Sequence, residues 1–199
     1  MLNTISQKLH GWTTGWRVLF LFLLNIVMTG YIMPVATAIL ALAANNSVLP
    51  LDLLFFYTPA EAFAMLEKYG PAGRALYMKI ELTVDLLYPI IYTLFLGLLI
   101  SWLFQRAFPP QNKMQKWNVA PLGAWFFDLL ENVGILTMLA MYPSQPALLA
   151  WIIMLFGLLK WALVFLCIVL VLVGLVKAAM NRFRKQTAYS GAGAESTHP

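Results

Sequence analysis

The sequence predicts an all-α integral membrane protein, a four-helix transmembrane bundle with an amphipathic helix in its first outer loop. Of its 199 residues, 61% are hydrophobic and only 11% are charged, and the mean hydropathy is +0.77. A soluble domain would carry about 25% charged residues, because they cover its surface. Four apolar stretches are each long enough to cross about 30 Å of hydrocarbon as a helix. We therefore expect one membrane domain over residues 1–185 and a disordered cytoplasmic tail over 186–199.

The four predicted spans are joined by connections of very different length. The first span follows Lys8 and Arg17 and is too long for a cleaved signal peptide, so we expect it to be retained. The short loop from Pro143 to Pro146 predicts that spans three and four form a tight antiparallel hairpin. The spans cover about residues 18–44, 77–104, 119–142 and 149–176.

The long outer connection, Asn45 to Leu76, is expected to contain a helix of its own. Thr58-Pro59-Ala60-Glu61 has an N-cap residue, a proline at the first helical position and a capping-box glutamate. Gly70-Pro71 predicts that this helix ends near Tyr69. A lid over the outer mouth of the bundle, a helix in the membrane interface and a packed connector all stay open. The residues that share its apolar face are Ala62, Met65, Leu66 and Tyr69.

The basic residues flank the spans unevenly, which predicts an orientation. Nine Lys and Arg residues lie in the N-terminal segment, the loop between spans two and three and the tail, against three on the other side. The positive-inside rule then places both termini in the cytoplasm, in a bacterial inner membrane or a plasma membrane. No basic-aromatic patch remains for nucleic acid, so we expect no nucleic-acid partner.

Five ionisable side chains within the predicted spans form the candidate site. Each such group costs about 2.5–3.5 kcal/mol on insertion scales and normally faces a bundle interior or a wet cavity. At about 1.5 Å per residue, Lys160 of span four lies level with Glu131 of span three, which predicts an ion pair with Glu131 or Asp128. Pro89 of span two removes a backbone donor and can leave a carbonyl facing a cavity. The predicted ligand-binding residues are Glu81, Asp85, Tyr88, Tyr92, Asp128, Glu131, Asn132 and Lys160.

The charges of this cluster do not balance. Four carboxylates cannot all stay ionised beside one ammonium in an apolar site, so either some are protonated or a hard cation such as Na⁺, Mg²⁺ or Ca²⁺ joins them. The single Cys167, and His10 and His198 near the termini, offer no thiolate or histidine metal site, and no Glu-x-x-His pair is present. We predict neither a cofactor nor a resident metal.

The segment Glu81-Leu82-Thr83-Val84-Asp85-Leu86-Leu87-Tyr88-Pro89 resembles the second-span pattern of the EXPERA family. That family includes the sterol Δ8-Δ7 isomerases (emopamil-binding proteins) and the sigma-2 receptor. The shared features are a Glu-Leu pair, a polar residue further along the same face and an aromatic-proline step. Span one carries Asn25 and Thr29 where the sigma-2 branch carries an aspartate. The chain also resembles small uncharacterised four-span membrane proteins of bacteria.

We expect a multi-pass membrane protein whose cavity binds a membrane lipid or another small amphiphilic, cationic molecule. The carboxylates would anchor the cation, and Tyr88, Tyr92, Trp125 and Phe126 would supply aromatic walls. Whether it is an enzyme stays open: an isomerase would use one carboxylic acid as proton donor and another as base. The alternatives are a small proton- or sodium-coupled transporter, for which a homodimer would be needed, and a membrane assembly subunit whose polar cluster is structural.

Overall fold

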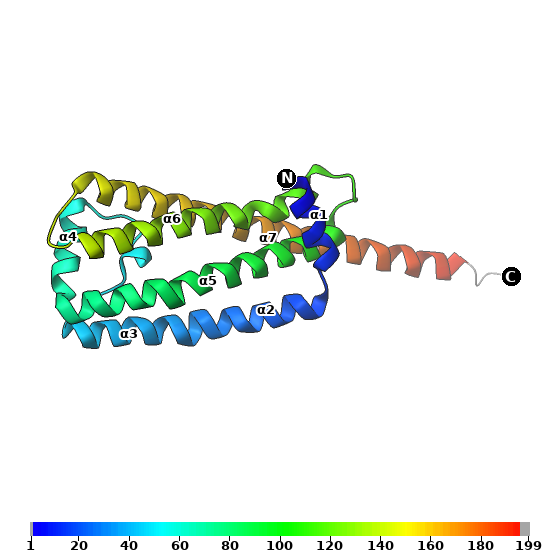
Figure 1. Ribbon diagram of the computed structural model, residues 1–199. Helices are drawn as coiled ribbons and strands as arrows, with labels where there is room; N and C mark the ends of the chain where they lie inside the picture. The colour runs from blue at the N-terminus through cyan, green and yellow to red at the C-terminus, as the bar shows by residue number, and fades with distance from the viewer. Residues whose placement is uncertain (1, 196–199) are drawn as a thin grey trace.

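The computed structural model describes the backbone of residues 2–195 and the side chains of residues 2–184, and every element in that part of the chain is helical. The long helices lie side by side as rods (Figure 1). The all-α prediction with four long apolar helices is confirmed, because each predicted span falls almost entirely within one of them. The helices long and apolar enough to cross a membrane are Gly15–Ala44, Gly70–Ala107, Lys113–Met141 and Ala147–Arg184.

The first rod is built from α2 (Gly15–Val27), a π-helical turn η1 (Met28–Ile32) and α3 (Met33–Ala44). Pro34 follows the π turn, and in a regular α-helix its ring would clash with the carbonyl one turn earlier. The wider π turn accommodates the proline without breaking the rod. Asn45, with a left-handed φ of 48°, ends α3.

The connection from Asn45 to Tyr69, called the outer segment below after the side predicted for it, contains the short helix η2 (Leu51–Leu53) and α4 (Pro59–Lys68), which lies across one end of the bundle (Figure 1). The predicted capping box is confirmed: the Glu61 N–H donates to Thr58 Oγ1 at 3.3 Å, and the Thr58 N–H donates to Glu61 Oε2 at 2.7 Å. The buried face of α4 differs slightly from the predicted one, because Phe63 packs inward while Met65 is only partly buried. The helix is thus packed onto α5 and α7.

Helix α5 (Gly70–Ala107) is the central rod and starts earlier than the predicted second span. Gly70 has a φ of 63°, which ends α4 and turns the chain. Pro71 then occupies the first turn of α5, where its missing N–H costs nothing. The early start brings Arg74 onto the helix, where its guanidinium donates to the Leu66 carbonyl at 2.9 Å and lies 3.6 Å from the centre of the Tyr142 ring.

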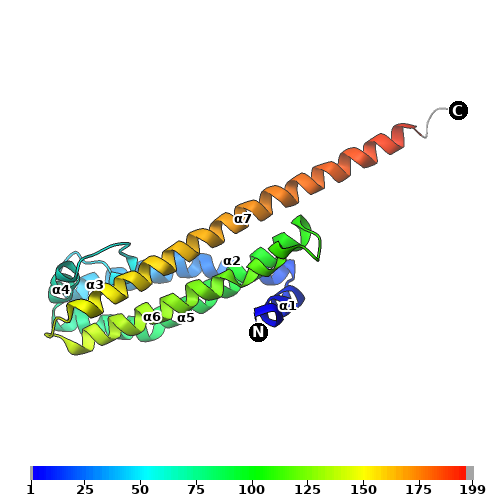
Figure 2. The same ribbon diagram turned by 90° about the horizontal axis from the view of Figure 1, so that it is seen from above.

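The second half of the chain folds into η3 (Lys113–Val119), α6 (Ala120–Met141) and α7 (Ala147–Glu195). Helices α6 and α7 form the predicted hairpin and pack closely along their length. Figure 2 shows α7 running past the ends of the other helices. The sequence predicts a disordered tail from residue 186, but the backbone of residues 186–195 continues α7. The helix can continue there because extending an existing helix needs no new nucleation. Residues 196–199 of that predicted tail lie outside the described residues.

A short N-terminal helix, α1 (Leu2–Trp12), packs against η3 and α5 at the end of the bundle opposite α4. Its contacts with η3 include a polar one: Asn118 Nδ2 donates to the Ser6 carbonyl at 3.1 Å, and the same amide nitrogen ties η3 to α5 by donating to Ser101 Oγ at 2.8 Å. The helix α1 is not among the predicted elements, because its eleven residues of mixed polarity are too few for a span. The two ends of the bundle are called the α1 end and the α4 end below.

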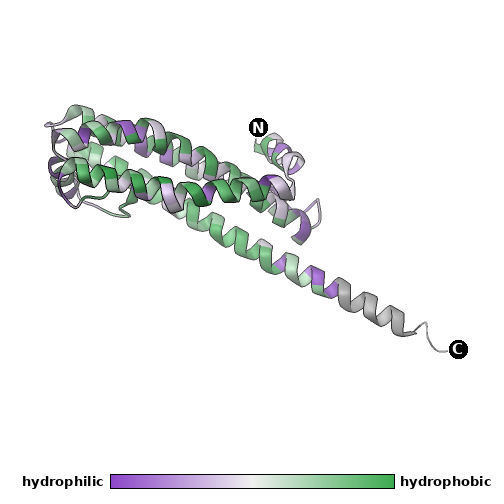
Figure 3. Cartoon of the chain, turned by 90° about the horizontal axis from the view of Figure 1, so that it is seen from below, coloured by the Kyte–Doolittle hydropathy of each residue, from purple (hydrophilic) through white to green (hydrophobic). Residues whose placement is uncertain are grey.

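Two apolar cores leave a polar layer between them. The core at the α4 end includes Leu40, Leu66 and Ile135, and the core at the α1 end includes Ile100 and Phe104. Many large hydrophobic side chains are exposed along the rods. Figure 3 shows the rods mostly in the hydrophobic colour, with hydrophilic residues at α1, at the α4 end and on the far part of α7. The candidate site lies in the layer between the cores.

Candidate functional site

A buried ion pair joins α6 and α7 at the centre of the site. Lys160 Nζ lies 2.6 Å from Glu131 Oε2 and 3.8 Å from Asp128 Oδ1. Lys160 is 6% exposed and Glu131 0%, so the pair is shielded from solvent. Gly157 makes room for it, because a Cβ at this position would lie 2.5 Å from Glu131 Oε1. The predicted ion pair is confirmed.

Two further hydrogen bonds tie α5 to the same layer. The Tyr92 hydroxyl donates to Asp128 Oδ2 at 2.8 Å, and Asn132 Nδ2 donates to the backbone carbonyl of Asp85 at 2.8 Å. That carbonyl would accept from residue 89 in a regular helix, but Pro89 has no N–H to give. The carbonyl freed by Pro89 is therefore satisfied by the Asn132 amide rather than left facing a cavity.

The outer segment contributes a fifth carboxylate, Asp52, which the sequence analysis does not include in the site. Lys160 Nζ donates to the Asp52 backbone carbonyl at 3.3 Å, and the Tyr77 hydroxyl donates to Asp52 Oδ1 at 2.9 Å. The Leu51 N–H donates in turn to the Tyr77 oxygen at 2.9 Å. Lys160 lies about 20 Å along α7 from Ala147, so the loop folds deep between the rods.

The signal for Asp52 is one acidic residue in an apolar run, Leu51-Asp52-Leu53-Leu54-Phe55. An acidic residue in such a run of the outer segment is a candidate for burial, because its apolar neighbours are residue types that are usually buried rather than exposed to solvent. Its depth cannot be counted from a helix end, since it lies in a loop. Asp52 is 7% exposed.

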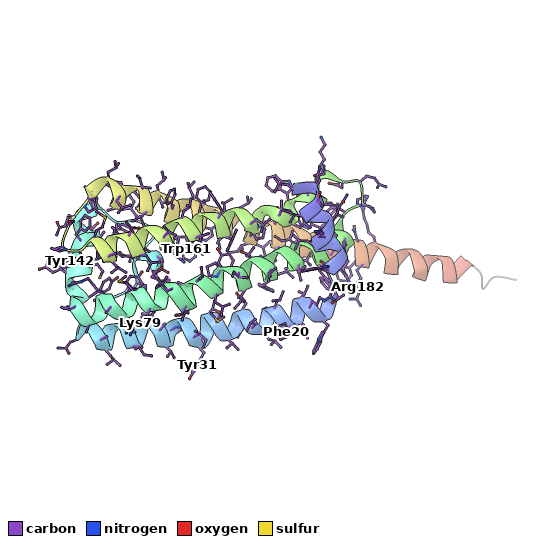
Figure 4. All side chains as sticks on the ribbon, in the orientation of Figure 1. Phe20, Tyr31, Lys79, Tyr142, Trp161 and Arg182 are labelled. Carbon is purple, nitrogen blue, oxygen red and sulfur yellow. The ribbon has the colours of Figure 1, made fainter. Side chains whose placement is uncertain are left out.

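A cavity of about 240 Å³ lies beside this cluster and takes lining residues from all four rods and from the outer segment. Its polar lining includes Asp85, whose carboxylate has no hydrogen bond or ion pair among the residues that the structure describes. Trp161 supplies an aromatic wall, and Figure 4 shows it between the rods. The other polar and aromatic lining residues are Asn25, Asp52, Tyr88, Tyr92, Asp128 and Lys160.

Several predicted site residues do not line this cavity. Glu131 and Asn132 contact residues that line the cavity: Glu131 pairs with Lys160, and Asn132 donates to the Asp85 carbonyl. Glu81 is 1% exposed, and neither of its carboxylate oxygens has a hydrogen-bond partner within the described part of the chain. It lies one turn from Asp85 towards the α4 end, where the apolar core closes over it.

The two aromatic residues expected from α6 do not form walls of the cavity. Phe126 is 50% exposed, and neither it nor Trp125 lines the cavity. Phe126 precedes Asp128 by two positions, which places it on nearly the opposite face of the helix. Trp161 of α7 takes the place that the sequence analysis gives to these two residues.

Tyr57 of the outer segment lies near the cluster and carries an unused hydrogen-bonding group. It is buried, and its hydroxyl has no partner among the side chains that can be placed. Burial, and after it the negative charges of Glu131 and Asp52, raise the pKa of this hydroxyl well above its usual value. Tyr57 therefore stays a neutral hydroxyl that can donate to a negatively charged neighbour.

The chemistry of the site follows from oxygen acceptors gathered around one lysine. Within the described residues no group of three or more His, Cys, Asp or Glu side chains has the arrangement of a metal site.

No family model, curated protein or solved structure matches the chain. The resemblance of span two to the EXPERA family therefore stays a prediction based on residues 81–89.

Proposed function

We propose that this is an integral membrane protein that binds the cationic head of a lipid-like, amphiphilic molecule in the cavity beside Lys160. The proposal places the four rods across a bilayer, with both termini and the α1 end on the cytoplasmic side. Apolar side chains exposed on the rods support this placement, and Tyr31 in Figure 4 points away from the other helices.

The observation that carries the proposal is the charge of the cavity. Three lining residues are carboxylic acids, Asp52, Asp85 and Asp128, and the only lining cation among the described residues is Lys160. The ammonium of Lys160 lies closest to Glu131, which is outside the lining. The Asp85 carboxylate is thus the acceptor left for a guest, and an ammonium group with its N–H donors satisfies it.

The apolar part of the cavity supports an amphiphile rather than a small ion. Along α5 and α7 the lining changes from Asp85 and Lys160 to Leu96, Val164 and Ile168 towards the α1 end. A head near Asp85 therefore has an apolar path for its chain. The cavity is smaller than the about 300–1,000 Å³ that usually encloses a whole small ligand, so we expect it to hold the head and the first carbons.

The packing of the rods gives the chain a way out towards lipid. The first rod packs mainly on α5, whereas α7 packs on α6 and α5. The cavity lies between these two groups, with Asn25 and Met33 of the first rod on one side and Val164 and Ile168 of α7 on the other. Asn25 and Met33 flank the π turn, a feature often found at functional sites.

The test is thermal unfolding in nanodiscs of neutral phosphatidylcholine with dodecylamine, using dodecanol as the uncharged control of equal length. We expect the amine alone to raise the melting temperature, since binding at a hundredfold excess over Kd stabilises a protein by about 2.7 kcal/mol. The Asp85→Asn variant should lose this shift. Glu81→Gln is the matched control, because it removes a buried carboxylate of the same helix that does not line the cavity.

Three results would reject the cation site. Equal stabilisation by dodecanol would show that only the apolar chain is bound. A full amine shift in Asp85→Asn would show that the carboxylate does not hold the head. Loss of the shift in both variants would assign it to general stability rather than to the cavity.

A further inference from the structure

A second hollow, a groove at the α1 end that shares no lining residue with the cavity, is lined by both apolar and basic side chains. It has a volume of about 1,020 Å³ and lies between the last turns of α5 and the part of α7 that continues past them. Leu103, Leu175 and Ala178 form its apolar part, while Arg106 and Arg182 stand at its polar part. Arg182 is labelled at this end in Figure 4.

The two helices are held together on both sides of the groove. At Gly174 they approach so closely that a Cβ would lie 2.9 Å from Leu103 Cβ. Further along α7, Asn181 Nδ2 donates to the carbonyls of Arg106 at 3.1 Å and Ala107 at 3.0 Å. The groove between these contacts therefore has a defined shape.

The basic side chains at this end have no acidic partner among the described side chains. All seven acidic residues whose side chains are described lie in the outer segment or in the polar layer of the candidate site, and both ion pairs found among the described side chains involve Lys160. Arg106 and Arg182 are exposed. No described side chain neutralises the positive charge at this end, which favours an anionic ligand there. The basic side chains concerned are Lys8, Arg17, Arg106, Lys113, Lys116, Lys177, Arg182 and Arg184.

Arg106 is positioned for a phosphate. Its Nη1 donates to the Trp102 carbonyl at 2.7 Å, and its guanidinium carbon lies 3.8 Å from the centre of the Trp102 ring. These contacts orient the guanidinium over the groove and use one of its five N–H donors. The remaining donors suit the oxygens of a phosphate, which arginine binds in a bidentate manner.

We propose that this groove binds an anionic phospholipid, with its phosphate between Arg106 and Arg182 and one acyl chain along the apolar surface of α7. Leu172 and Leu175 are exposed about one turn apart on this side of α7 and provide that surface. A tryptophan beside two arginines is typical of the interface between headgroups and hydrocarbon. The proposal depends on the membrane placement above but not on the ligand of the cavity.

The test is native mass spectrometry of the full chain, in which bound dioleoyl phosphatidylglycerol is counted against dioleoyl phosphatidylcholine. We expect the wild type to prefer the anionic lipid and the Arg106→Gln/Arg182→Gln variant to bind it at least about tenfold more weakly, given the contribution of each basic residue near an anionic surface. Lys113→Gln/Lys116→Gln is the matched control, because it removes equal charge from exposed residues at the same end, outside the groove.

Three outcomes would overturn the site. An equal loss in the lysine control would show diffuse attraction rather than a groove. Equal binding of the two lipids by the wild type would remove the preference. Displacement of the anionic lipid by inorganic phosphate at similar concentration would show that the acyl chain contributes nothing. Circular dichroism of both double variants checks the fold, and because all four substituted residues are exposed, we expect unchanged helicity.

Discussion

Replacing Lys160 by methionine should be among the most damaging single changes in this protein. The substitution keeps an unbranched side chain but removes the ammonium that lies 2.6 Å from Glu131 and 3.8 Å from Asp128. Breaking a buried pair by removing one partner costs about 3–5 kcal/mol, because the other charge stays buried without compensation. Since two carboxylates lose their cation here, we expect a value at the upper end of that range.

A second substitution, added to Lys160→Met, should recover part of the lost unfolding free energy, by an amount that depends on which carboxylate is neutralised. Adding Glu131→Gln removes the charge of the more deeply buried partner, so the free-energy loss of the double variant should be about 1–3 kcal/mol smaller than the sum of the two single losses. Adding Asp128→Asn instead should restore less. Asp128 keeps the Tyr92 hydroxyl as a donor, whereas Glu131 would be left 0% exposed and without a hydrogen-bond donor among the described residues.

The assay is reversible unfolding by sodium dodecyl sulfate in mixed micelles, followed by far-ultraviolet circular dichroism, for the wild type and the five variants of the two cycles. Additivity within about 0.5 kcal/mol would mean that Lys160 and Glu131 do not interact. A larger recovery with Asp128→Asn than with Glu131→Gln would mean that the 3.8 Å contact is the stronger one. Either result would refute the assignment of Glu131 as the principal partner of Lys160.

Three further changes test the surroundings of the site. Gly157→Ala would place a Cβ 2.5 Å from a Glu131 oxygen and should cost about 1–3 kcal/mol in the same unfolding assay, whereas Gly30→Ala, with nothing within 4 Å of the new Cβ, should be nearly neutral. Tyr77→Phe removes the hydroxyl that ties η2 to α5 and should cost about 1–3 kcal/mol and speed proteolysis of the outer segment, while unchanged proteolysis would reject this tie. The backbone N–H of Thr58, the N-cap residue, donates to Glu61 and lowers the pKa of its carboxyl group. The capping bond therefore stabilises α4 at pH values above the pKa of Glu61 in the unfolded chain, and this stabilisation is lost as the pH falls through the lower pKa of the folded state. Hydrogen-exchange protection of α4 should decrease on acidification, and Glu61→Gln should remove that pH dependence.

The sequence predicts well whatever lies along a continuous helix. Lys160 and Glu131 belong to different spans, yet counting about 1.5 Å per residue from each span end is enough to bring them level. The capping box of α4 and the space left by Gly157 are equally local, because they depend on residues a few positions apart or on one missing side chain. The angular position of a residue is also fixed by helical geometry, but which face turns inward is not, as Phe126 on the outside of α6 demonstrates.

Only the tertiary structure decides which side chains meet in the cavity. Asp52 joins the site because its loop folds down to the Lys160 ammonium and the Tyr77 hydroxyl, and no periodicity in the sequence describes a loop. Glu81 is excluded although it lies one turn from Asp85, because the core at the α4 end closes over it. The sequence by itself thus determined the four long helices and the depth of their charges, since a helix has one rise and one twist per residue. The membership of the cavity depended on contacts between distant segments, because those contacts alone set the path of a loop and the face that each helix buries.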